Sequence, residues 1–476
     1  MNKKIILTAC LILSFLSFAE GKSIRITGKV TNTGGKGIPG VVVNDGVNFT
    51  TTDNNGKWTL MTDTLVSKFV SISTPAEYKL PEKDGLAYFY KPLREVLRNG
   101  KCQFVLQKRA KDVDKFSFLA ISDPQVKTEH DMERWVSETV IDLRRTIDSI
   151  SATREVVGMT LGDLVFDEMG LYNRYATSLK NTGAVFFQTI GNHDFNKAYQ
   201  DLHNMRKGCP HYAEEKYHQY FGPTDYSFNI GKIHVISMKS INYVGHRKYV
   251  EALTDAQLEW LEKDLGYVKG GTTIFINMHA AGWNVEHSGG NIRNAEEIQN
   301  ILKGYNVHFF CGHTHFFQNV EVSDSLYQHN ISAACGSWWT GNVGQSGAPN
   351  GYLIVDAEGD NIRWHYKPTG KPTTLQMRIY KPGEFRRAKS FLVANVWDYD
   401  SKCKVMVAED GNEFVPMELV KEVDEQYIRQ QNAVNKDENE IISTHLFKYK
   451  LSKETKVAKV RFINRFGEIY EDMVNL

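Results

Sequence analysis

The sequence predicts an α/β protein in which a central α/β domain lies between an N-terminal β-sandwich and a C-terminal β-rich domain. The chain has 476 residues, enough for about three domains of usual size. Apolar strand-like runs alternate with amphipathic helix-like segments in the middle, whereas both flanks carry short alternating runs separated by turn signals. With 41% hydrophobic and 24% charged residues, the composition excludes a collagen-like, coiled-coil or wholly disordered chain.

The first nineteen residues are typical of a secretory signal peptide. Lys3 and Lys4 form a basic start, Ile5 to Leu16 is apolar, and Ser17-Phe18-Ala19 is a small-x-small cleavage site. No later run reaches the ~18 apolar residues that a transmembrane helix needs. We therefore expect an exported protein, periplasmic or on the surface of a bacterium, without a transmembrane segment. A lipoprotein anchor at Cys10 is the alternative.

Residues 20–110 are expected to form the N-terminal sandwich. Ile24, Ile26 and Val30 alternate with polar residues, and turns are indicated at Gly34-Gly35-Lys36-Gly37 and Asp53-Asn54-Asn55-Gly56. This pattern of short strands and tight turns favours a small all-β domain.

Residues 111–371 are expected to form the α/β domain. Apolar residues recur at helical spacing over Asp131 to Ser151, and Thr254-x-x-Gln257 is a capping box at the start of a second helix. Helices alternating with apolar strands predict layers packed around a sheet.

Residues 372–476 return to a strand pattern. Strands are predicted at Phe391 to Val396, Lys404 to Val407 and Val457 to Ile463. The polar stretch Gln426 to Glu440, rich in Asn and Gln, is predicted to be a long loop.

Charge and cysteine content exclude some classes of function. The 57 basic and 56 acidic residues leave a formal charge of +1, so no nucleic-acid partner is indicated. Without the signal peptide five scattered cysteines remain, with no CxxC pair, which is neither a disulfide framework nor a zinc-binding pattern. We expect mainly buried thiols, with one or two disulfides left open: Cys102, Cys209, Cys311, Cys335 and Cys403.

Five polar clusters in the central domain each follow an apolar run directly. If each run is a central strand, the clusters project from the carboxyl ends of the strands, where open α/β sheets bind ligands. The clusters are Asp123-Pro124-Gln125, Gly162-Asp163, Gly191-Asn192-His193-Asp194, His279 and Gly312-His313-Thr314-His315.

The residue types in these clusters indicate a metal centre. Two Asp, a Gln, an Asn and three His supply oxygen and nitrogen donors without a thiolate, which suits Mn²⁺, Fe or Zn²⁺. Seven donors exceed what one ion needs. Two ions about 3.5 to 4 Å apart and sharing a carboxylate would use them all and could act on a phosphoryl centre. Each cluster by itself could instead be a turn or a packed core histidine.

In this order, the five clusters resemble the calcineurin-like metallophosphoesterase superfamily, in the bacterial three-domain branch whose first motif is Asp-Pro-Gln. The flanks resemble the N-terminal and C-terminal modules of that branch, as at Val41 to Gly46 and Asn395 to Asp400. The resemblance implies a four-layer α/β/β/α core between these modules.

The resemblance also implies the roles of the site residues. One ion would be held by Asp123, Gln125, Asp163 and His315, and the other by Asp163, Asn192, His279 and His313. A hydroxide bridging the ions would attack phosphorus in line. His193 would stabilise the phosphoryl oxygens or protonate the leaving group, and Asp194 would orient and charge it. Gly162, Gly191 and Gly312 would let the backbone turn sharply beside the ions.

Two features depart from the family pattern or are not assigned by it. Phe166 stands where many relatives carry a polar residue, and Asp167 one place later is interpreted as surface charge. Trp338 and Trp339, in a Gly-rich setting after a strand-like run, are candidates for stacking on the substrate. The alternative is that one packs in the core and the other between domains.

We therefore expect an exported metal-dependent phosphoric ester hydrolase that cleaves a phosphomonoester, phosphodiester or pyrophosphate. Its cofactors would be two divalent ions, with Mn²⁺ favoured because Gln125 is a weaker donor than His, and with Mg²⁺, Fe or Zn²⁺ as alternatives. Small-molecule, lipid or glycan phosphate esters are the expected substrates. The alternative function is a cell-envelope binding protein with an inert core, and the oligomeric state stays open.

Overall fold

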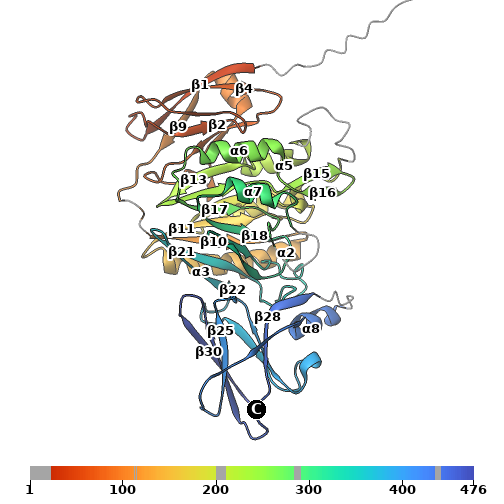
Figure 1. The fold of residues 1–476 in the computed structure, drawn as a ribbon. Helices are drawn as coiled ribbons and strands as arrows, with labels where there is room; N and C mark the ends of the chain where they lie inside the picture. Colours follow the sequence, from red (N-terminus) through yellow and green to blue (C-terminus); the bar gives the residue numbers. More distant parts are fainter. Residues whose placement is uncertain (1–22, 112, 114, 200–210, 284–290, 435–440) are drawn as a thin grey trace, which may run out of the picture.

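The computed structural model describes residues 23–476 except 112, 114, 200–210, 284–290 and 435–440. It confirms the predicted fold class: a central α/β core lies between two β-rich regions, which occupy opposite ends of the molecule (Figure 1). The predicted signal peptide, Cys10 and Cys209 lie outside the described residues.

The N-terminal region contains two small sheets that enclose a hydrophobic core. Val30, Val43 and Trp58 are among its buried side chains. The sheets have the orders β4 (Lys57–Asp63), β1 (Ser23–Asn32), β9 (Cys102–Leu106) and β3 (Phe49–Thr51), β2 (Val42–Asn44), β5 (Phe69–Ser73), β8 (Tyr90–Pro92), with one short helix, α1 (Leu93–Asn99).

A seven-stranded sheet forms one half of the central core. Its inner strands β10, β11 and β12 run parallel, and the N-terminal segment adds two strands to one edge through pairing of Leu86 with Phe186. The order is β22 (Asn361–Pro368), β21 (Gly351–Glu358), β10 (Lys115–Ile121), β11 (Glu155–Leu161), β12 (Val185–Thr189), β7 (Leu86–Ala87), β6 (Glu82–Lys83).

A six-stranded sheet forms the other half, and the two sheets pack face to face. Phe118 of β10 lies 5.4 Å, between ring centroids, from both Phe275 and Phe310 of the second sheet. These contacts produce the inner β/β layers. The order is β13 (Tyr226–Ile230), β14 (Ile233–Ser237), β17 (Thr273–Asn277), β18 (Asn306–Cys311), β20 (Leu326–Asn330), β19 (Gln318–Ser323).

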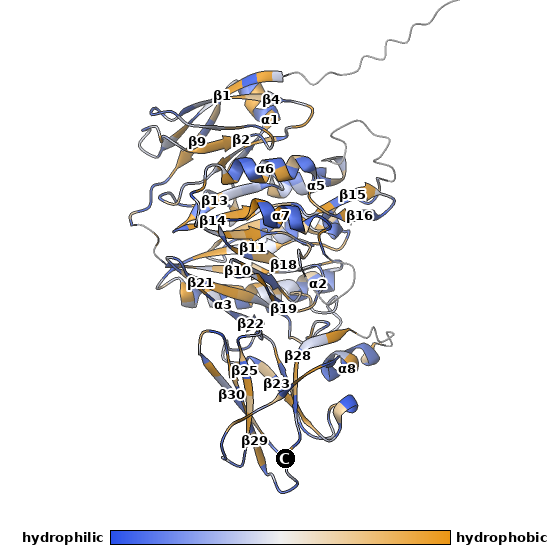
Figure 2. Ribbon diagram, viewed as in Figure 1, coloured by the Kyte–Doolittle hydropathy of each residue, from blue (hydrophilic) through white to orange (hydrophobic). Residues whose placement is uncertain are grey.

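Helices cover the outer faces of both sheets and complete four layers (Figure 1). The inner strands of the sheets are largely hydrophobic, whereas α6 and α7 contain many hydrophilic residues (Figure 2). The helices are α2 (Glu129–Arg134), α3 (Ile141–Ile150), α4 (Tyr172–Leu179), α5 (His211–Phe221), α6 (Asp255–Leu265) and α7 (Ala295–Ile301). A hairpin of β15 (Ile241–Gly245) and β16 (Lys248–Glu251) is separate from both sheets.

Two predicted helices are confirmed, one with a local difference. The helix expected over Asp131 to Ser151 consists of α2 and α3 joined by a π-helical segment, Trp135–Val140. The capping box is present, because Thr254 Oγ1 accepts a hydrogen bond from Gln257 N and Gln257 Oε1 accepts one from Thr254 N.

The C-terminal region is a sandwich of two four-stranded sheets around Leu392, Val407 and Phe462. The sheets have the orders β23 (Met377–Tyr380), β24 (Leu392–Val396), β28 (Ile442–Tyr449), β27 (Glu418–Val423) and β26 (Val415–Pro416), β25 (Lys404–Glu409), β29 (Val457–Ile463), β30 (Ile469–Asn475).

The prediction of a long loop over Gln426 to Glu440 is wrong for the first half of this stretch, which lies in helix α8 (Glu425–Ala433). Asp424 caps this helix by accepting hydrogen bonds from Gln426 N and Tyr427 N. Tyr427 and Ile428 pack against Val343 of the central core. These tertiary contacts stabilise a helix whose own sequence is largely polar.

Arg465 of the C-terminal region contacts several residues of the central core. Its guanidinium contacts Asp400 at 3.0 Å and Glu321 of β19 at 2.7 Å, and it lies over the rings of Tyr327 and Trp364. A charged group that lies over two neighbouring aromatic rings and contacts two carboxylates links the C-terminal region to the central core.

Two further sequence expectations concern cysteines and membrane spans. Cys102, Cys311 and Cys335 are buried and Cys403 is half-buried, and all four are free thiols. Within the described ranges, the helices are too short or too polar to traverse a bilayer.

Candidate functional site

The polar clusters meet at one edge of the two facing sheets. Asp123, Asp163 and Asn192 follow the parallel strands β10, β11 and β12, and His279 and His313 follow the parallel strands β17 and β18. Because parallel strands end on the same edge of their sheet, and the two sheets pack together, residues from five segments converge.

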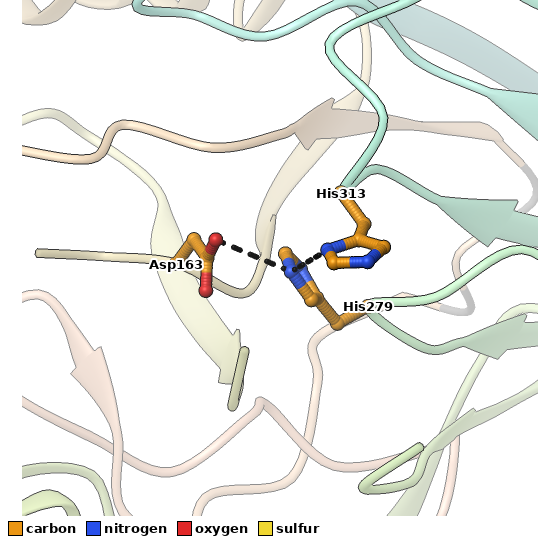
Figure 3. A group of neighbouring side chains, drawn as sticks. All are labelled: Asp163, His279 and His313. Carbon is orange, nitrogen blue, oxygen red and sulfur yellow. Dashed lines mark hydrogen bonds and ion pairs between the residues drawn. The ribbon is translucent and has the colours of Figure 1, made fainter. Parts of the chain in front are cut away.

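Asp163, His279 and His313 form the centre of this site (Figure 3). One ligand atom from each lies within 4.8 Å of the others. His279 Nε2 lies 3.3 Å from Asp163 Oδ2, 3.1 Å from His313 Nδ1 and 3.0 Å from Asn192 Oδ1. The other ring nitrogen, Nδ1, lies 2.7 Å from the carbonyl oxygen of Leu161, to which it donates. This bond directs Nε2 of His279 toward the centre of the cluster, the orientation that its predicted role as a metal ligand requires.

Asp123, Gln125 and His315 form the second half of the site. Gln125 Nε2 donates to Asp163 Oδ2 at 2.6 Å, which joins the two halves. His315 Nδ1 donates to the carbonyl oxygen of Gly336 at 2.8 Å, and its Nε2 lies 3.6 Å from Asp123 Oδ1. His315 is therefore also held by a backbone carbonyl with its second nitrogen toward a carboxylate.

The donor set fits divalent cations. Among the residues that the structure describes, Asp123 Oδ1 and Gln125 Oε1 are buried without a hydrogen-bond partner. Buried acceptors without partners are costly in a protein unless another group, such as a cation, contacts them. All seven predicted ligand residues thus lie in one connected cluster, and two of their oxygens lack the hydrogen bonds that would otherwise satisfy them.

The ionisable groups of the site shift one another's pKa values. Burial raises the pKa of a carboxyl group, but His279 and His193 outweigh it at Asp163 and hold its pKa well below the usual range. Burial is likewise outweighed at Asp123 by His315, so its pKa is lowered. Burial lowers the pKa of His279, but the Asp163 carboxylate raises it to about 9 overall. Both carboxylates are therefore anionic at neutral pH and favour a bound cation.

Backbone strain is concentrated at this site. Five of the seven predicted ligand residues are non-glycine residues with positive φ: Asp123 (47°), Gln125 (41°), Asp163 (52°), His313 (70°) and His315 (54°). Such conformations cost about 1–3 kcal/mol each and persist where the surrounding structure enforces them, typically at functional sites. The strain indicates that these side chains are placed for a function rather than for stability.

The three glycines predicted beside the metals are required mainly by close packing. A Cβ on Gly191 would overlap the Asp163 carboxylate, and one on Gly312 would overlap Ser122 and Asp123. Gly162 has φ of 91°, and a Cβ there would lie 2.6 Å from His279 Nδ1. The backbone therefore approaches the ligand side chains more closely than any other residue allows.

We expect Gly191→Ala to displace Asp163 and to lower kcat/KM for phosphate esters about 100-fold, because a shift of about 1 Å at a reacting centre can cost this much. The measurement is steady-state hydrolysis at saturating metal. Gly170→Ala is the matched control, since a Cβ at Gly170 meets nothing within 4 Å. Equal activity of the two variants would contradict the requirement for close packing.

The structure corrects the partner predicted for His193. Its Nδ1 lies 2.8 Å from Asp167 Oδ1, and its ring stacks on Phe166 with 3.9 Å between centroids. Lys197 Nζ lies 2.7 Å from the same Asp167 oxygen. Asp167 is therefore a site residue and not surface charge; the hydrogen bonds from His193 and Lys197 outweigh its burial and lower its pKa.

Asp194 does not orient His193 as predicted. Its carboxylate accepts hydrogen bonds from Leu164 N, Gly191 N and Tyr172 Oη, all at 2.9–3.1 Å. Burial and the nearby charge of Asp163 raise its pKa to about 7. Asp194 thus holds together the loops that carry Asp163 and Asn192, which is a structural role beside the site.

The two candidate tryptophans have different surroundings. Trp339 is 5% exposed, and its Nε1 donates to the Pro124 carbonyl at 2.9 Å, so it packs against the Asp-Pro-Gln loop. Trp338 is 40% exposed and its ring lies 4.8 Å from that of His315. Of the two, only Trp338 presents its ring surface beside the site.

The β15–β16 hairpin also contributes residues that the sequence did not indicate. Glu251 Oε1 lies 3.7 Å from His313 Nε2, and the ring of Tyr249 lies 6.0 Å from that of His313. Arg247 contacts Asp167 Oδ2 at 2.9 Å. No motif marks these residues, because their proximity depends on how the hairpin folds over the edge of the sheet.

Three family models match consecutive parts of the chain. The N terminal of calcineurin-like phosphoesterase matches residues 24–109, calcineurin-like phosphoesterase matches 116–317, and the C terminal of calcineurin-like phosphoesterase matches 328–470. The protein is therefore a metal-dependent phosphoric ester hydrolase. It belongs to the calcineurin-like phosphoesterase family, in the branch with separate N-terminal and C-terminal modules.

Several solved structures are similar to the chain at low identity. A dimetal phosphatase from Danio rerio is 13% identical with a TM-score of 0.38, covering 54% of this chain and 97% of that one. The purple acid phosphatase PPD1 from yellow lupin is 11% identical with a TM-score of 0.38, covering 69% and 67%. A 5'-nucleotidase from Candida albicans is 9% identical with a TM-score of 0.34, covering 53% and 50%. No curated protein matches the sequence significantly.

Proposed function

We propose that this protein is an exported two-metal phosphoesterase that hydrolyses a phosphomonoester, phosphodiester or pyrophosphate by direct attack of water. The observation that carries the proposal is the convergence of seven donor side chains with two buried oxygens, Asp123 Oδ1 and Gln125 Oε1, that lack hydrogen bonds. Divalent ions bound there would supply Lewis-acid polarisation of the phosphoryl oxygens and a lowered pKa of water.

Asp163 belongs to both proposed sets of metal ligands. Its Oδ2 contacts both Gln125 Nε2, toward Asp123 and His315, and His279 Nε2, toward Asn192 and His313. A carboxylate in this position is suited to serve both ions. We favour Mn²⁺ because the donor set contains an amide at Gln125 and another at Asn192 and no thiolate.

His193 is the proposed acid–base residue. Its backbone N donates to Asp163 Oδ1 at 2.8 Å, so it lies next to the proposed metal centre. With Nδ1 hydrogen-bonded to Asp167, the ring can exchange a proton through Nε2 with the oxygen of the leaving group. Lys197 and Arg247 also contact Asp167, so a bound phosphate ester would meet positive charge on this side.

Export is proposed from the predicted signal peptide at 1–19. An exported location favours small-molecule, lipid or glycan phosphate esters of the cell envelope as substrates. The basic and acidic residues balance almost completely, which gives no support to a polymeric nucleic acid as substrate.

An activity panel tests the proposal. The metal-free protein is loaded in turn with Mn²⁺, Mg²⁺ and Zn²⁺ and assayed against phosphomonoesters, phosphodiesters, nucleotides and pyrophosphate. We expect turnover of at least one class, loss of turnover with a chelator, and recovery on adding metal. Metal binding without any turnover would favour the alternative, an envelope binding protein. Fractionation of cells producing the full chain checks export, and a mature protein beginning at Met1 in the cytoplasm would contradict it.

A further inference from the structure

Trp338 lies at one end of the metal site in a strained conformation. All eight tryptophans belong to the described part of the chain, and Trp338 is the one that is exposed, with 40% of its surface accessible. Its φ is 53°, which a bulky residue adopts at a cost of about 1–3 kcal/mol. Since Trp339 is also left-handed, with φ of 59°, the surrounding structure must enforce this turn.

The turn belongs to a segment that we call the tryptophan loop, residues 337–343. On one side it is held by Arg134 at the end of α2. Arg134 Nη1 donates to the Trp339 carbonyl at 2.6 Å, Nη2 donates to the Gly341 carbonyl at 3.3 Å, and the guanidinium lies over the Trp339 ring. These contacts come from the central core itself.

On the other side the loop is held by Gln430 of α8, in the C-terminal region. Gln430 Oε1 accepts hydrogen bonds from Asn342 N at 2.8 Å and Val343 N at 3.1 Å, and its Nε2 donates to the Val343 carbonyl at 2.9 Å. The fit is close, because a Cβ on Gly341 would overlap this amide. One buried side chain thus pairs three backbone groups of the loop.

The C-terminal region also contacts the residues that come directly after the tryptophan loop in the sequence. Asn395 Nδ2 donates to the Ser346 carbonyl at 3.0 Å and Arg378 Nη1 donates to the Gly347 carbonyl at 2.9 Å. Gln345 N, in the same stretch, donates to the backbone oxygen of the predicted ligand His315 at 3.0 Å. The shape of this side of the site therefore depends on contacts from another domain.

We propose that Trp338 is the surface against which the organic group of the substrate packs, and that Gln430 is a positioning residue that fixes this surface. The inference rests on the proposed function and narrows the substrate class to phosphate esters whose organic group has a flat aromatic face. An indole ring recognises such a group by stacking, with little loss of side-chain entropy because the loop is already fixed. The C-terminal region in this way shapes the substrate site through Gln430, although none of the candidate site residues in the described part of the chain comes from it.

The test compares phenyl phosphate with glycerol 3-phosphate by phosphate release. For Trp338→Ala we expect KM for phenyl phosphate to rise about 3- to 10-fold, with kcat nearly unchanged and glycerol 3-phosphate unaffected. Trp338→Phe, which keeps an aromatic ring, should restore KM to within about 2-fold of the wild type. Equal changes for both substrates, or none for either, would overturn the stacking role.

Gln430→Ala should produce the same selective rise in KM for phenyl phosphate, although Gln430 is not at the metal site. Arg429→Ala is the matched control, because Arg429 is on the same helix but contacts Glu425 and the Glu384 carbonyl within the C-terminal region. The melting temperature of each variant is measured in parallel. A lowered melting temperature with unchanged substrate preference would overturn the positioning role of Gln430.

The two proposals fail in different ways. A wild-type enzyme that hydrolyses none of the compounds in the activity panel would overturn the proposed function and this inference with it. A wild-type enzyme that is active, but whose substrate preference is insensitive to Trp338→Ala, would overturn the inference and leave the proposed function intact.

Discussion

Replacing Asp163 by asparagine is expected to lower kcat/KM about 1,000-fold or more and to release bound metal. In the proposed mechanism, bound metal ions would supply several kcal/mol of transition-state stabilisation, and each 1.36 kcal/mol corresponds to about a factor of ten in rate. Asp163 is fully buried, and its Oδ2 contacts residues of both halves of the site. The neutral amide of asparagine lacks the negative charge that would bind both ions. Metal content and the rate of hydrolysis are measured on the same protein sample.

The fold should survive this change, because asparagine has nearly the same shape and Asp163 Oδ1 accepts a backbone hydrogen bond that an amide oxygen can also accept. Added Mn²⁺ should raise the melting temperature of the metal-free wild type but not of Asp163→Asn. Asp324→Asn, at an exposed turn, is the control for the loss of one carboxylate. Full metal content and activity in Asp163→Asn would contradict the assignment of the metal centre.

His193→Ala is expected to lower kcat about 100- to 10,000-fold, the usual contribution of a general acid or base. Metal content should not change, because the His193 contact with Asp163 is made by the backbone N, which alanine retains. The measurement is kcat at saturating metal with substrates of differing leaving-group pKa. If His193 protonates the leaving group, the loss is greatest for the poorest leaving group.

The partner of His193 is tested by comparing Asp167→Asn with Arg247→Ala. Asp167→Asn should lower kcat about 10-fold or more, since the amide accepts the Nδ1 hydrogen bond without supplying charge. Arg247→Ala removes an exposed residue that contacts the other Asp167 oxygen, so a much smaller effect is expected. If Asp167→Asn retained wild-type kcat and its dependence on the leaving group, Asp167 would have no part in the reaction.

Much of the fold, and the grouping of the candidate site residues, could be predicted because both depend on local patterns. The apolar runs ending at Ile121, Leu161 and Cys311 are strands β10, β11 and β18. Side chains just beyond parallel strands must meet at the same edge, so the predicted ligand residues could be grouped without knowing the packing. The position of a residue that directly follows a strand is determined by backbone pairing in the sheet and depends little on the course of the surrounding loops.

The remaining site residues depend on loops whose course no local pattern determines. Asp194 follows His193 in the sequence, yet the backbone turn directs its carboxylate to Leu164 N and Gly191 N, while Asp167 from another loop reaches the imidazole. The same holds for Trp338 and Trp339, since adjacent positive φ angles send one ring outward and the other inward. Helix α8 was missed because its packing against the central core outweighs its polar sequence.

The sequence by itself determined the order of the strands' polar ends, the donor types and hence the class of hydrolase. Only the tertiary structure decided which carboxylate meets His193, which tryptophan lies at the site, and that the C-terminal region holds it through Gln430. The physical reason is that strand ends are aligned by periodic backbone hydrogen bonding. Loop side chains, in contrast, take their positions from contacts between segments far apart in the chain, which residue spacing does not encode.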